Sequence, residues 1–393
     1  MNTKRILFLT LGKINTTKDS GIYNDLVEEL SKHAHITVLC PHERRYGYKS
    51  LLLTEENVTI YQQFTPNIQK TKKIEKVIST FLTEFLMIYA FIKNFRVFKY
   101  NTLIISTPPI FVYTFIKVVK FFNPEMKIYL LLKDIYPQNA VDLGMLNKKS
   151  FSYYISRNTE KKLYRIADKI GCMSQANIDY VKKHNPKIAQ KLELNPNSIN
   201  IAKYPNINRV KSIHNRKTLN LVYGGNIGLP QDPILICNFI EKIETLNNVK
   251  LTICGDGTGS GIIKKFIAKN NINKTIIKPS TNKSQYFKLL ETSDIGLIFL
   301  NNSFTIPNYP SRVLDYLFFQ LTFLTITDTA TDLTNFIRDN NLGYCYTNKE
   351  TQIDESITLL KNLRPGNLRA YDCEKILKEN FNIEQSGRKI LNF

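Results

Sequence analysis

The sequence LNLVYGGNIG (residues 219–228) is an apolar run that ends in a glycine turn, and VKLTICGDG (249–257) repeats that pattern. Between them, DPILICNFIEKIETL (232–246) places apolar residues at helical spacing. A strand, a helix and a second strand within about 40 residues are typical of a βαβ unit in a parallel sheet. The stretch therefore predicts a doubly wound α/β domain, in which ligands bind beyond the carboxyl ends of the strands.

The same alternation continues on both sides of this stretch. RILFLTL (5–11) and HITVLC (35–40) read as strands around a helix, and a polar, aperiodic, basic segment separates them from the second series of strands. We predict an α/β fold with two doubly wound, Rossmann-like domains that face each other across a cleft holding the site. The predicted parts are an N-terminal domain at 1–203, a linker at 204–217, a C-terminal domain at 218–365, and a helical tail at 366–393 that packs back toward the N-terminal domain.

Net charge, cysteine spacing and apolar stretches indicate which kinds of partner and cellular environment the chain suits. The 393 residues carry a net charge of +21, of which residues 1–200 supply +14, from 30 Lys and Arg against 16 Asp and Glu. Such an excess attracts polyanions, so nucleic acid and anionic lipid both remain open. The six cysteines show no CxxC or zinc spacing and are expected to be reduced, as in the cytosol. The longest uncharged apolar stretch, 100–116, contains two prolines and is too short for a spanning helix.

Glycine turns are the first candidate binding groups. Glycine lets a backbone approach a ligand closely, and the helix that follows offers unpaired N–H groups to a phosphate. The alternative is a tight strand-to-helix turn without a ligand. The candidate residues of the two turns are Gly224, Gly225, Asn226, Gly255, Asp256 and Gly257.

A second candidate is the helix predicted in NYPSRVLDYLFFQ (308–320). Ser311 is a good N-cap, and Arg312 then lies in the first turn, where a cation opposes the helix dipole. A bound phosphate would remove that conflict, and Asp315, on the same face, could accept hydrogen bonds from ribose or sugar hydroxyls. The alternative is a capped surface helix with a solvated arginine.

Two further residues come from the N-terminal domain. Asp134 follows an apolar strand, where charged groups commonly face the ligand crevice, and Gly21 stands at a helix N-terminus near that crevice. We expect Asp134 to take part in catalysis and Gly21 to bind the donor substrate. Each of the two residues has a purely structural alternative.

Other catalytic chemistries lack their signatures. The five histidines form no HExxH pair, no two aspartates stand two apart as in a DxD motif, and no GxSxG, Walker A or kinase signature occurs. We therefore expect no metal and no cofactor, with basic residues and helix N-termini handling a nucleotide-sugar.

The order of these segments resembles family 4 GT-B glycosyltransferases over nearly the whole chain. The N-terminal SGIYNDLVEELSKHAHITVLC, Pro205-Asn206, LVYGGNIG, VKLTICGDG and ETSDIGLIFL are similar to family segments in order and spacing. KDIYPQNAVDLGM and YPSRVLDYL look closest to the branch of amino-sugar transferases for O-antigen and capsule. The resemblance implies an acceptor-binding N-terminal domain, a C-terminal domain that binds a UDP-sugar donor, and retention of anomeric configuration. It also implies that Arg312 contacts the donor diphosphate and Asp315 the ribose, and that the acceptor is a lipid-linked saccharide.

The sequence departs from the family pattern at three places. Pro307 and Asp315 stand where the family often has two Glu residues, Gln231 stands near the place of a usual Lys, and FFQLTFLT replaces a glycine-containing turn. Two other functions therefore stay open. A nucleotide-sugar epimerase of GT-B fold would need paired carboxylates and histidines, and a basic nucleic-acid-binding protein would need a recognition motif, and neither feature is visible. We expect no nucleic-acid partner.

The segment 70–99 suggests contact with a membrane surface. It holds seven basic residues near its ends and only two acids, with bulky apolar residues at helical spacing between them. Basic ends and inserted apolar groups favour docking on the anionic inner face of the cell membrane, helped by Lys117 and Lys120. The alternative is a core helix with a solvated basic edge. The expected localisation is cytoplasmic and peripheral to that membrane.

Overall fold

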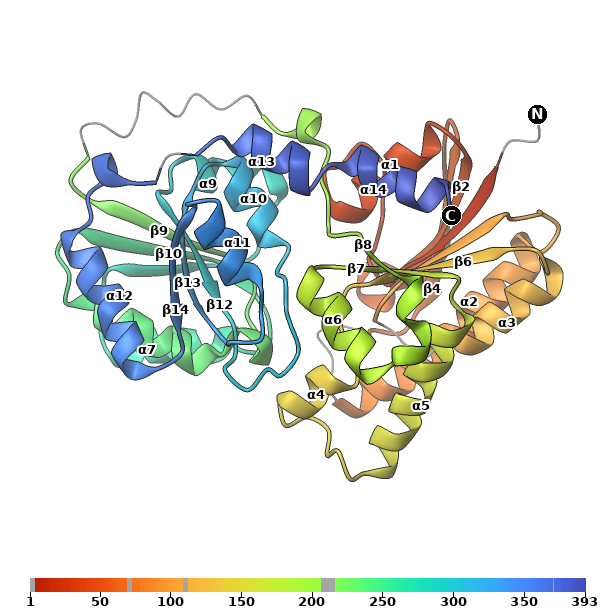
Figure 1. Cartoon of the computed structure of the whole chain (residues 1–393), viewed down its shortest axis with the longest axis horizontal. Helices are drawn as coiled ribbons and strands as arrows, with labels where there is room; N and C mark the ends of the chain where they lie inside the picture. The colour runs from red at the N-terminus through yellow and green to blue at the C-terminus, as the bar shows by residue number, and fades with distance from the viewer. Residues whose placement is uncertain (1–3, 69–72, 109–111, 206–215, 370) are drawn as a thin grey trace. The chain divides into compact units, whose positions relative to one another are not determined.

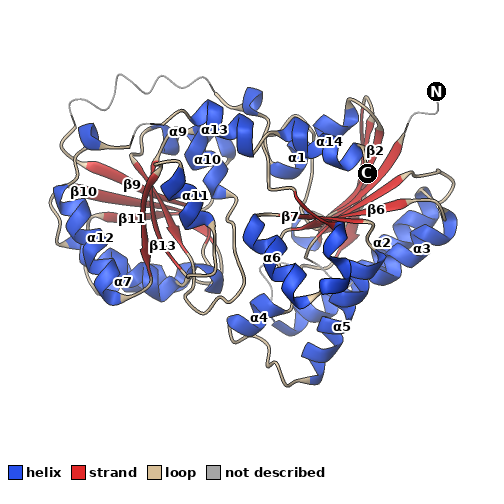
Figure 2. Cartoon of the chain, viewed as in Figure 1, coloured by secondary structure: helices blue, strands red, loops and turns tan. Residues whose placement is uncertain are grey.

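The computed structural model describes residues 4–68, 73–108, 112–205, 216–369 and 371–393. The chain divides into two compact units, the first made of residues 1–204 and 381–393 and the second of residues 205–380. Each unit is an α/β sandwich with helices on both faces of a sheet (Figures 1 and 2). The predicted α/β class with two Rossmann-like sheets is therefore confirmed.

The first unit is built on an eight-stranded sheet in the order β3-β4-β2-β1-β5-β6-β7-β8. All neighbouring strands pair in parallel except β3, which is antiparallel to β4. The strands are β1 (Arg5–Leu9), β2 (His35–Glu43), β3 (Leu51–Glu55), β4 (Val58–Thr65), β5 (Thr102–Ser106), β6 (Lys127–Leu132), β7 (Lys169–Cys172) and β8 (Leu192–Leu194).

Helices cover both faces of this sheet. Helices α1 (Ile22–Ser31) and α14 (Ile383–Leu391) lie on one face, and α2 (Lys73–Asn94), α3 (Tyr113–Phe122), α5 (Phe151–Ile166) and α6 (Gln175–His184) lie on the other (Figure 1). A short helix, α4 (Gln138–Asp142), follows β6. The division follows from right-handed crossovers, because the chain reverses its direction of travel across the sheet after β4. The buried core includes Phe8, Val27, Val38 and Leu131.

The second unit has a six-stranded sheet in the order β11-β10-β9-β12-β13-β14, with parallel pairing throughout. Its strands are β9 (Leu219–Asn226), β10 (Val249–Asp256), β11 (Thr275–Lys278), β12 (Ile295–Phe299), β13 (Thr322–Thr327) and β14 (Gly343–Thr347). Its helices are α7 (Pro233–Glu244), α8 (Ser260–Lys269), α9 (Lys283–Glu291), α10 (Arg312–Phe318), α11 (Leu333–Asp339), α12 (Glu350–Asn362) and α13 (Cys373–Asn380).

The segments outside the two sheets differ in detail from the predicted divisions. Residues 206–215 of the predicted linker lie outside the described residues, whereas Lys203 is ion-paired inside the first unit. The predicted tail is split, since α13 belongs to the second unit and α14 contacts α1 in the first. The helix expected in 70–99 is present as α2, and residues 69–72 lie outside the described part. Within the described residues, no helix has the length and apolar content needed to span a membrane.

Candidate functional site

The second sheet has a topological switch point between β9 and β12. Strands β10 and β11 continue from β9 in one direction, and β13 and β14 continue from β12 in the other. Helices that leave neighbouring strands toward opposite faces open a crevice at the carboxyl ends, which is where doubly wound domains bind ligands. Strand β9 ends there at Asn226, in the first glycine turn.

Arg312 reaches this crevice from the start of α10. Its Cζ lies 4.2 Å from the centroid of the Tyr223 ring, and its Nη2 donates a long hydrogen bond of 3.4 Å to the carbonyl oxygen of Asn226. Its Nη1 is buried and makes no hydrogen bond with a described residue. A buried guanidinium N–H group without a partner is unfavourable, so this position is suited to an anionic ligand that accepts its hydrogen bond.

Tyrosines fix the surroundings of Arg312. The hydroxyl of Tyr223 donates to the Asn226 carbonyl at 2.6 Å, and the Tyr316 hydroxyl accepts from the Gly224 N–H at 3.0 Å. Burial raises the pKa of both Tyr223 and Tyr316, although the charge of Arg312 opposes the shift. Both phenols are therefore neutral at physiological pH and serve as fixed hydrogen-bonding groups.

One of the four candidate glycines faces Arg312, and the other three stand where neighbouring atoms leave no room for a Cβ atom. Gly225 is exposed, has a φ of +109°, and a Cβ built on it would lie 3.5 Å from Nη2 of Arg312. A Cβ on Gly224 would lie 2.0 Å from the hydroxyl of Tyr286, and one on Gly255 would lie 2.0 Å from the carbonyl of Gly225. Gly257 has a φ of +149°, and its Cβ would lie 2.2 Å from the Ile227 carbonyl. Of these four, Gly225 presents open backbone to a ligand beside Arg312.

Two polar side chains shape the glycine turns. Oε1 of Gln231 accepts hydrogen bonds from Nδ2 of Asn226 at 3.0 Å and from the Gly228 N–H at 3.1 Å. Oδ1 of Asp256 accepts from the Gly257 N–H at 3.1 Å. Gln231, near the place where the resembled family has a lysine, therefore closes the turn with a neutral amide, and sequence reasoning missed this role.

Ser311 and Asp315 lie at the start of α10. Ser311 precedes the helix, but its backbone is helical and its side chain makes no capping hydrogen bond, so the expected side-chain cap is wrong. The local reason is that a helical Ncap points its hydroxyl away from the first-turn N–H groups. Asp315 lies in the first turn, is half-buried, and its negative charge contributes to the raised pKa of Tyr286 and Tyr316.

The first sheet has its own switch point, between β1 and β5. Ser106, at the end of β5, donates from its Oγ to Oγ1 of Thr10 at 3.0 Å. Tyr23, in the first turn of α1, belongs to this group because it forms hydrogen bonds with Ser106 and Thr10. The pKa of Tyr23 is raised, mainly by burial and also by the charge of Asp134, although the two hydrogen bonds lower it. A polar cluster thus stands at the carboxyl edge of the first sheet, where Asp134 was expected.

Asp134 is a titratable group of this cluster, and burial is the cause of its pKa shift. Its carboxyl is half-buried and makes no hydrogen bond or ion pair with a described residue, and burial raises its pKa from 3.8 to about 6. Burial also lowers the pKa of the adjacent Lys133 to about 7. Sequence reasoning singled out Asp134 and missed Lys133, whose signal was its place next to Asp134 at the same strand end. Perturbed groups of this kind cluster at functional sites.

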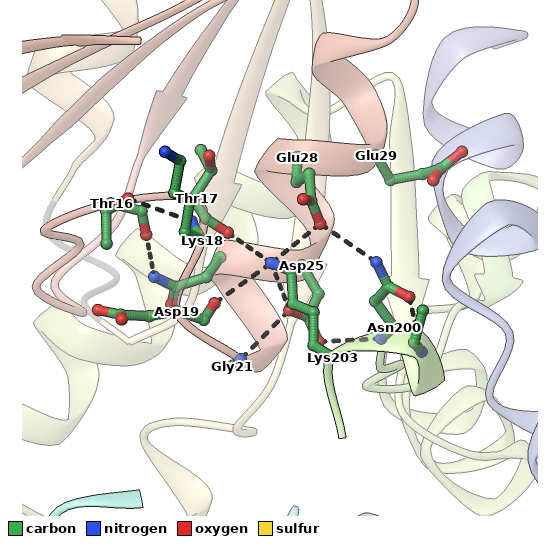
Figure 3. Close-up of polar contacts among 12 residues, drawn as sticks. Thr16, Thr17, Lys18, Asp19, Gly21, Asp25, Glu28, Glu29, Asn200 and Lys203 are labelled. Atoms are coloured by element: carbon green, nitrogen blue, oxygen red, sulfur yellow. Dashed lines mark hydrogen bonds and ion pairs between the residues drawn. The ribbon is translucent and has the colours of Figure 1, made fainter. Parts of the chain in front are cut away.

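Gly21 stands where it was expected, immediately before α1. Its backbone is extended, and its N–H donates to Oδ1 of Asp25 at 3.3 Å (Figure 3). Asp25 is fully buried and belongs to a polar network with Glu28, Asn200 and Lys203. Sequence reasoning did not find this network, because Asn200 and Lys203 lie 172 or more residues from Asp25 and Glu28 along the chain.

The described residues contain no group of three or more His, Cys, Asp or Glu side chains placed to hold a metal ion.

Comparison with known proteins identifies the fold. No protein-family model and no curated protein matches the chain. Among solved structures, Escherichia coli trehalose-6-phosphate synthase bound with UDP-2-fluoro glucose matches at a TM-score of 0.70 and 8% identity, over 99% of this chain and 98% of that one. Anabaena HepE in complex with UDP and glucose matches at a TM-score of 0.67 and 11% identity, over 99% and 98%. The lipopolysaccharide outer core galactosyltransferase WaaB, in its apo form, matches at 0.61 and 12%, over 98% and 99%. The full-length agreement with these structures shows that the chain has the two-domain GT-B fold.

Proposed function

We propose that the chain is a retaining glycosyltransferase that takes its sugar from a UDP-sugar and needs no metal ion. The observation that carries the proposal is Arg312, a guanidinium held over Tyr223 at the switch point, with a buried Nη1 that has no partner among the described residues. The GT-B neighbours that bind UDP or a UDP-sugar support the same assignment. Membership of family 4, and of its O-antigen and capsule amino-sugar branch, rests on the sequence resemblance.

The second unit then binds the donor. The guanidinium of Arg312 neutralises the diphosphate, which gains negative charge as the bond from the anomeric carbon to the phosphate oxygen breaks. The exposed backbone of Gly225 lets the diphosphate approach the end of β9 closely. The carboxylate of Asp315 accepts hydrogen bonds from the ribose hydroxyls.

The first unit supplies the acceptor side of the reaction. With a pKa of about 6, Asp134 is a carboxylate at neutral pH and remains basic enough to take a proton. The acceptor hydroxyl forms the new glycosidic bond to the anomeric carbon, its proton passes to the Asp134 carboxylate, and UDP leaves with the electron pair of the broken bond. The configuration at the anomeric carbon is retained because attack and departure take place on the same face of the sugar.

Binding of UDP by Arg312 variants tests the donor site without any need for an acceptor. We expect Arg312→Ala to weaken UDP affinity at least tenfold by calorimetry, in line with about 1.5–3 kcal/mol for a hydrogen bond to a charged group. Arg338→Ala, which removes an exposed arginine of the same unit, is the matched control and should bind UDP like the wild type. Equal UDP affinity in Arg312→Ala and Arg338→Ala would refute the assignment.

We further propose that the acceptor is a lipid-linked saccharide of O-antigen or capsule synthesis, met at the cytoplasmic face of the membrane. Helix α2 supports this, because one face buries Thr83, Met87 and Phe91 while another exposes a row of apolar side chains at helical spacing. That exposed row consists of Ile78, Phe81, Leu82, Phe85 and Tyr89, and Phe85 is 61% exposed.

Other exposed groups near α2 fit the same partner. Phe121 at the end of α3 is 80% exposed, and α3 contacts both α2 and α5. Exposed cations accompany this apolar surface at Lys93, Arg96, Lys99 and Lys117. An apolar face bordered by cations matches the chemistry of an anionic bilayer, to which each basic residue adds about 1 kcal/mol. Lys70 and Lys72 of the expected basic end lie outside the described residues.

Flotation with anionic liposomes tests this surface. We expect recovery at low salt, loss at high salt because headgroup attraction is screened, and weaker recovery for Phe85→Ser/Tyr89→Ser. Ile276→Ser, at a residue of the second unit that is 55% exposed, is the matched control. If the wild type ignores anionic liposomes at low salt, or if Ile276→Ser weakens recovery as much as the double variant, membrane docking through α2 is wrong.

A further inference from the structure

The loop between β1 and α1 (residues 12–20) is fixed by side chains from distant parts of the chain. It begins at the carboxyl end of β1, next to the first switch point. Thr17, in the middle of the loop, is buried, and its N–H donates to Oε2 of Glu55 at 3.1 Å. Nδ2 of Asn24 donates to the carbonyl of Thr16 at 2.6 Å. These contacts tie the loop to Glu55 of β3 and to Asn24 of α1.

Lys203 makes the central contacts of this arrangement (Figure 3). Its Nζ donates to the loop carbonyls of Thr17 and Asp19, the latter at 3.3 Å. The same Nζ forms ion pairs with Oδ1 of Asp25 at 3.0 Å and with Oε2 of Glu28 at 2.9 Å. The Lys203 side chain is 12% exposed, and its ammonium group ties the loop to the first two turns of α1.

Asn200 completes the network from the same segment as Lys203. Its N–H donates to Oδ2 of Asp25 at 2.9 Å, and its Nδ2 donates to Oε2 of Glu28 at 3.2 Å. Both carboxylate oxygens of Asp25 are thereby satisfied inside the unit, because Oδ1 also accepts from the Gly21 N–H. Lys203 directly precedes Tyr204, where the N-terminal segment of the first unit ends, so one side chain links the loop to the place where the chain first leaves that unit.

Stability alone does not account for such a cluster. Burying charges is expensive, and apolar side chains of similar volume often stabilise a fold equally well or better. What a lysine adds is geometry, since carbonyl and carboxylate partners around one ammonium allow few arrangements of the loop. Loops that border a ligand site gain binding strength when they are ordered in advance, because less entropy is lost on binding.

We propose that Lys203 is a positioning residue, which holds the loop 12–20 in the conformation that receives the acceptor beside Tyr23 and Asp134. The expected effect on the acceptor KM rests on the proposed transferase function. The expected effect on the order of the loop rests only on the contacts of Lys203. Lys203 touches neither substrate in this account and acts through the loop.

Hydrogen exchange on the full chain tests the structural part. In Lys203→Met, peptides covering residues 12–21 should exchange about tenfold faster than in the wild type, while peptides of the second unit should be unchanged. Lys203→Arg should restore most of the protection. Lys32→Met is the matched control, because Lys32 directly follows α1, is 53% exposed and pairs with Glu29 at 2.6 Å; this variant should leave the loop protected.

Steady-state kinetics test the functional part. Lys203→Met should raise the acceptor KM about tenfold, change kcat little and leave the donor KM unaltered, because Arg312, Gly225 and Asp315, which bind the donor in the proposed function, lie in the other unit. Because Lys203→Met leaves Asp25 buried without its cation, the variant Asp25→Asn/Lys203→Met provides a neutral cluster if the single variant does not fold. The double variant should show the same fast exchange and the same rise in acceptor KM.

Each result decides a separate question. Unchanged exchange of residues 12–21 in the folded variants overturns the role of Lys203 in holding the loop. Faster exchange with an unaltered acceptor KM overturns its role in acceptor binding and leaves a structural ion pair. A wild type that transfers no sugar refutes the proposed function, and the exchange result then still decides whether Lys203 holds the loop.

Discussion

Replacing Asp134 with asparagine should make the protein more stable and less active. The pKa of the carboxyl rises from 3.8 to about 6 through burial, a shift of about two units. At about 1.4 kcal/mol per unit, ionised Asp134 costs the folded state up to about 3 kcal/mol. Because the side chain is half-buried, water screens part of this cost, and we expect a gain of about 1–2 kcal/mol for Asp134→Asn at pH 8.

The sign of the pH dependence follows from the direction of the shift. Between pH 3.8 and about 6 the folded chain keeps the Asp134 proton while the unfolded chain has lost it. Stability therefore falls as pH rises through this window, and the cost of Asp134 is complete above about pH 6 and vanishes toward pH 3.8. The stabilisation of Asp134→Asn should accordingly shrink as the pH is lowered from 8 to 4.

Denaturant unfolding at pH 8 and pH 4 measures the free energy of unfolding of Asp134→Asn. The control is Asp339→Asn, which changes an exposed aspartate of the second unit. Transfer activity should fall about 10²- to 10⁴-fold, the range for loss of a general base, and wild-type activity should decline as the pH drops through about 6. A variant that is destabilised equally at both pH values would show that burial does not raise the pKa of Asp134, and one that keeps full activity would show that Asp134 is not the general base.

Three further predictions concern the second unit. Asp315→Asn should mainly raise the KM for the UDP-sugar, because ribose contacts contribute equally to ground and transition states; an unchanged KM would make Asp315 structural. Activity should persist in excess EDTA, and strict dependence on Mg²⁺ or Mn²⁺ in a transfer assay would contradict metal-independent catalysis. Tyr316→Phe removes the acceptor of the buried Gly224 N–H and should lower the free energy of unfolding by about 1–3 kcal/mol in urea titrations, whereas loss of activity with full stability would give the hydroxyl a different role.

Much of the fold was predictable because its central strands are continuous apolar runs between glycine and polar turns. The strands of 219–228 and 249–257 were expected and are present as β9 and β10, paired in parallel. The hairpin of β3 and β4 was not predicted. Its strand β3 is an edge strand with an exposed face, and Leu51 and Leu52 there give no clear alternation of buried and exposed residues. The short β8 and the half-buried β14 were not predicted either, because they are also edge strands without a clear alternation of buried and exposed residues.

The candidate site was predictable where function is local in sequence. Arg312 was recognised because a cation at a helix start is electrostatically unfavourable, and Asp134 because it follows an apolar strand. The support for these residues was not visible in the sequence. The ring of Tyr223 beneath Arg312 comes from β9, and the Lys203 network joins residues 172 or more positions apart. These residues come together only in the folded chain, and no local sequence pattern predicts their contacts.

Transfer of a sugar from a UDP-sugar to a lipid-linked acceptor can be measured in a single assay. Purified protein is incubated with a panel of UDP-sugars, with and without polyprenyl-linked saccharide, and UDP release and glycosylated lipid are measured together. We predict that one donor gives UDP and glycosylated lipid in equal amounts, that both depend on the acceptor, and that Arg312→Ala lowers kcat/KM for this reaction about 100-fold. Conversion of the free UDP-sugar into its epimer without acceptor, or no response to any UDP-sugar alongside salt-sensitive binding to duplex DNA, would contradict the account.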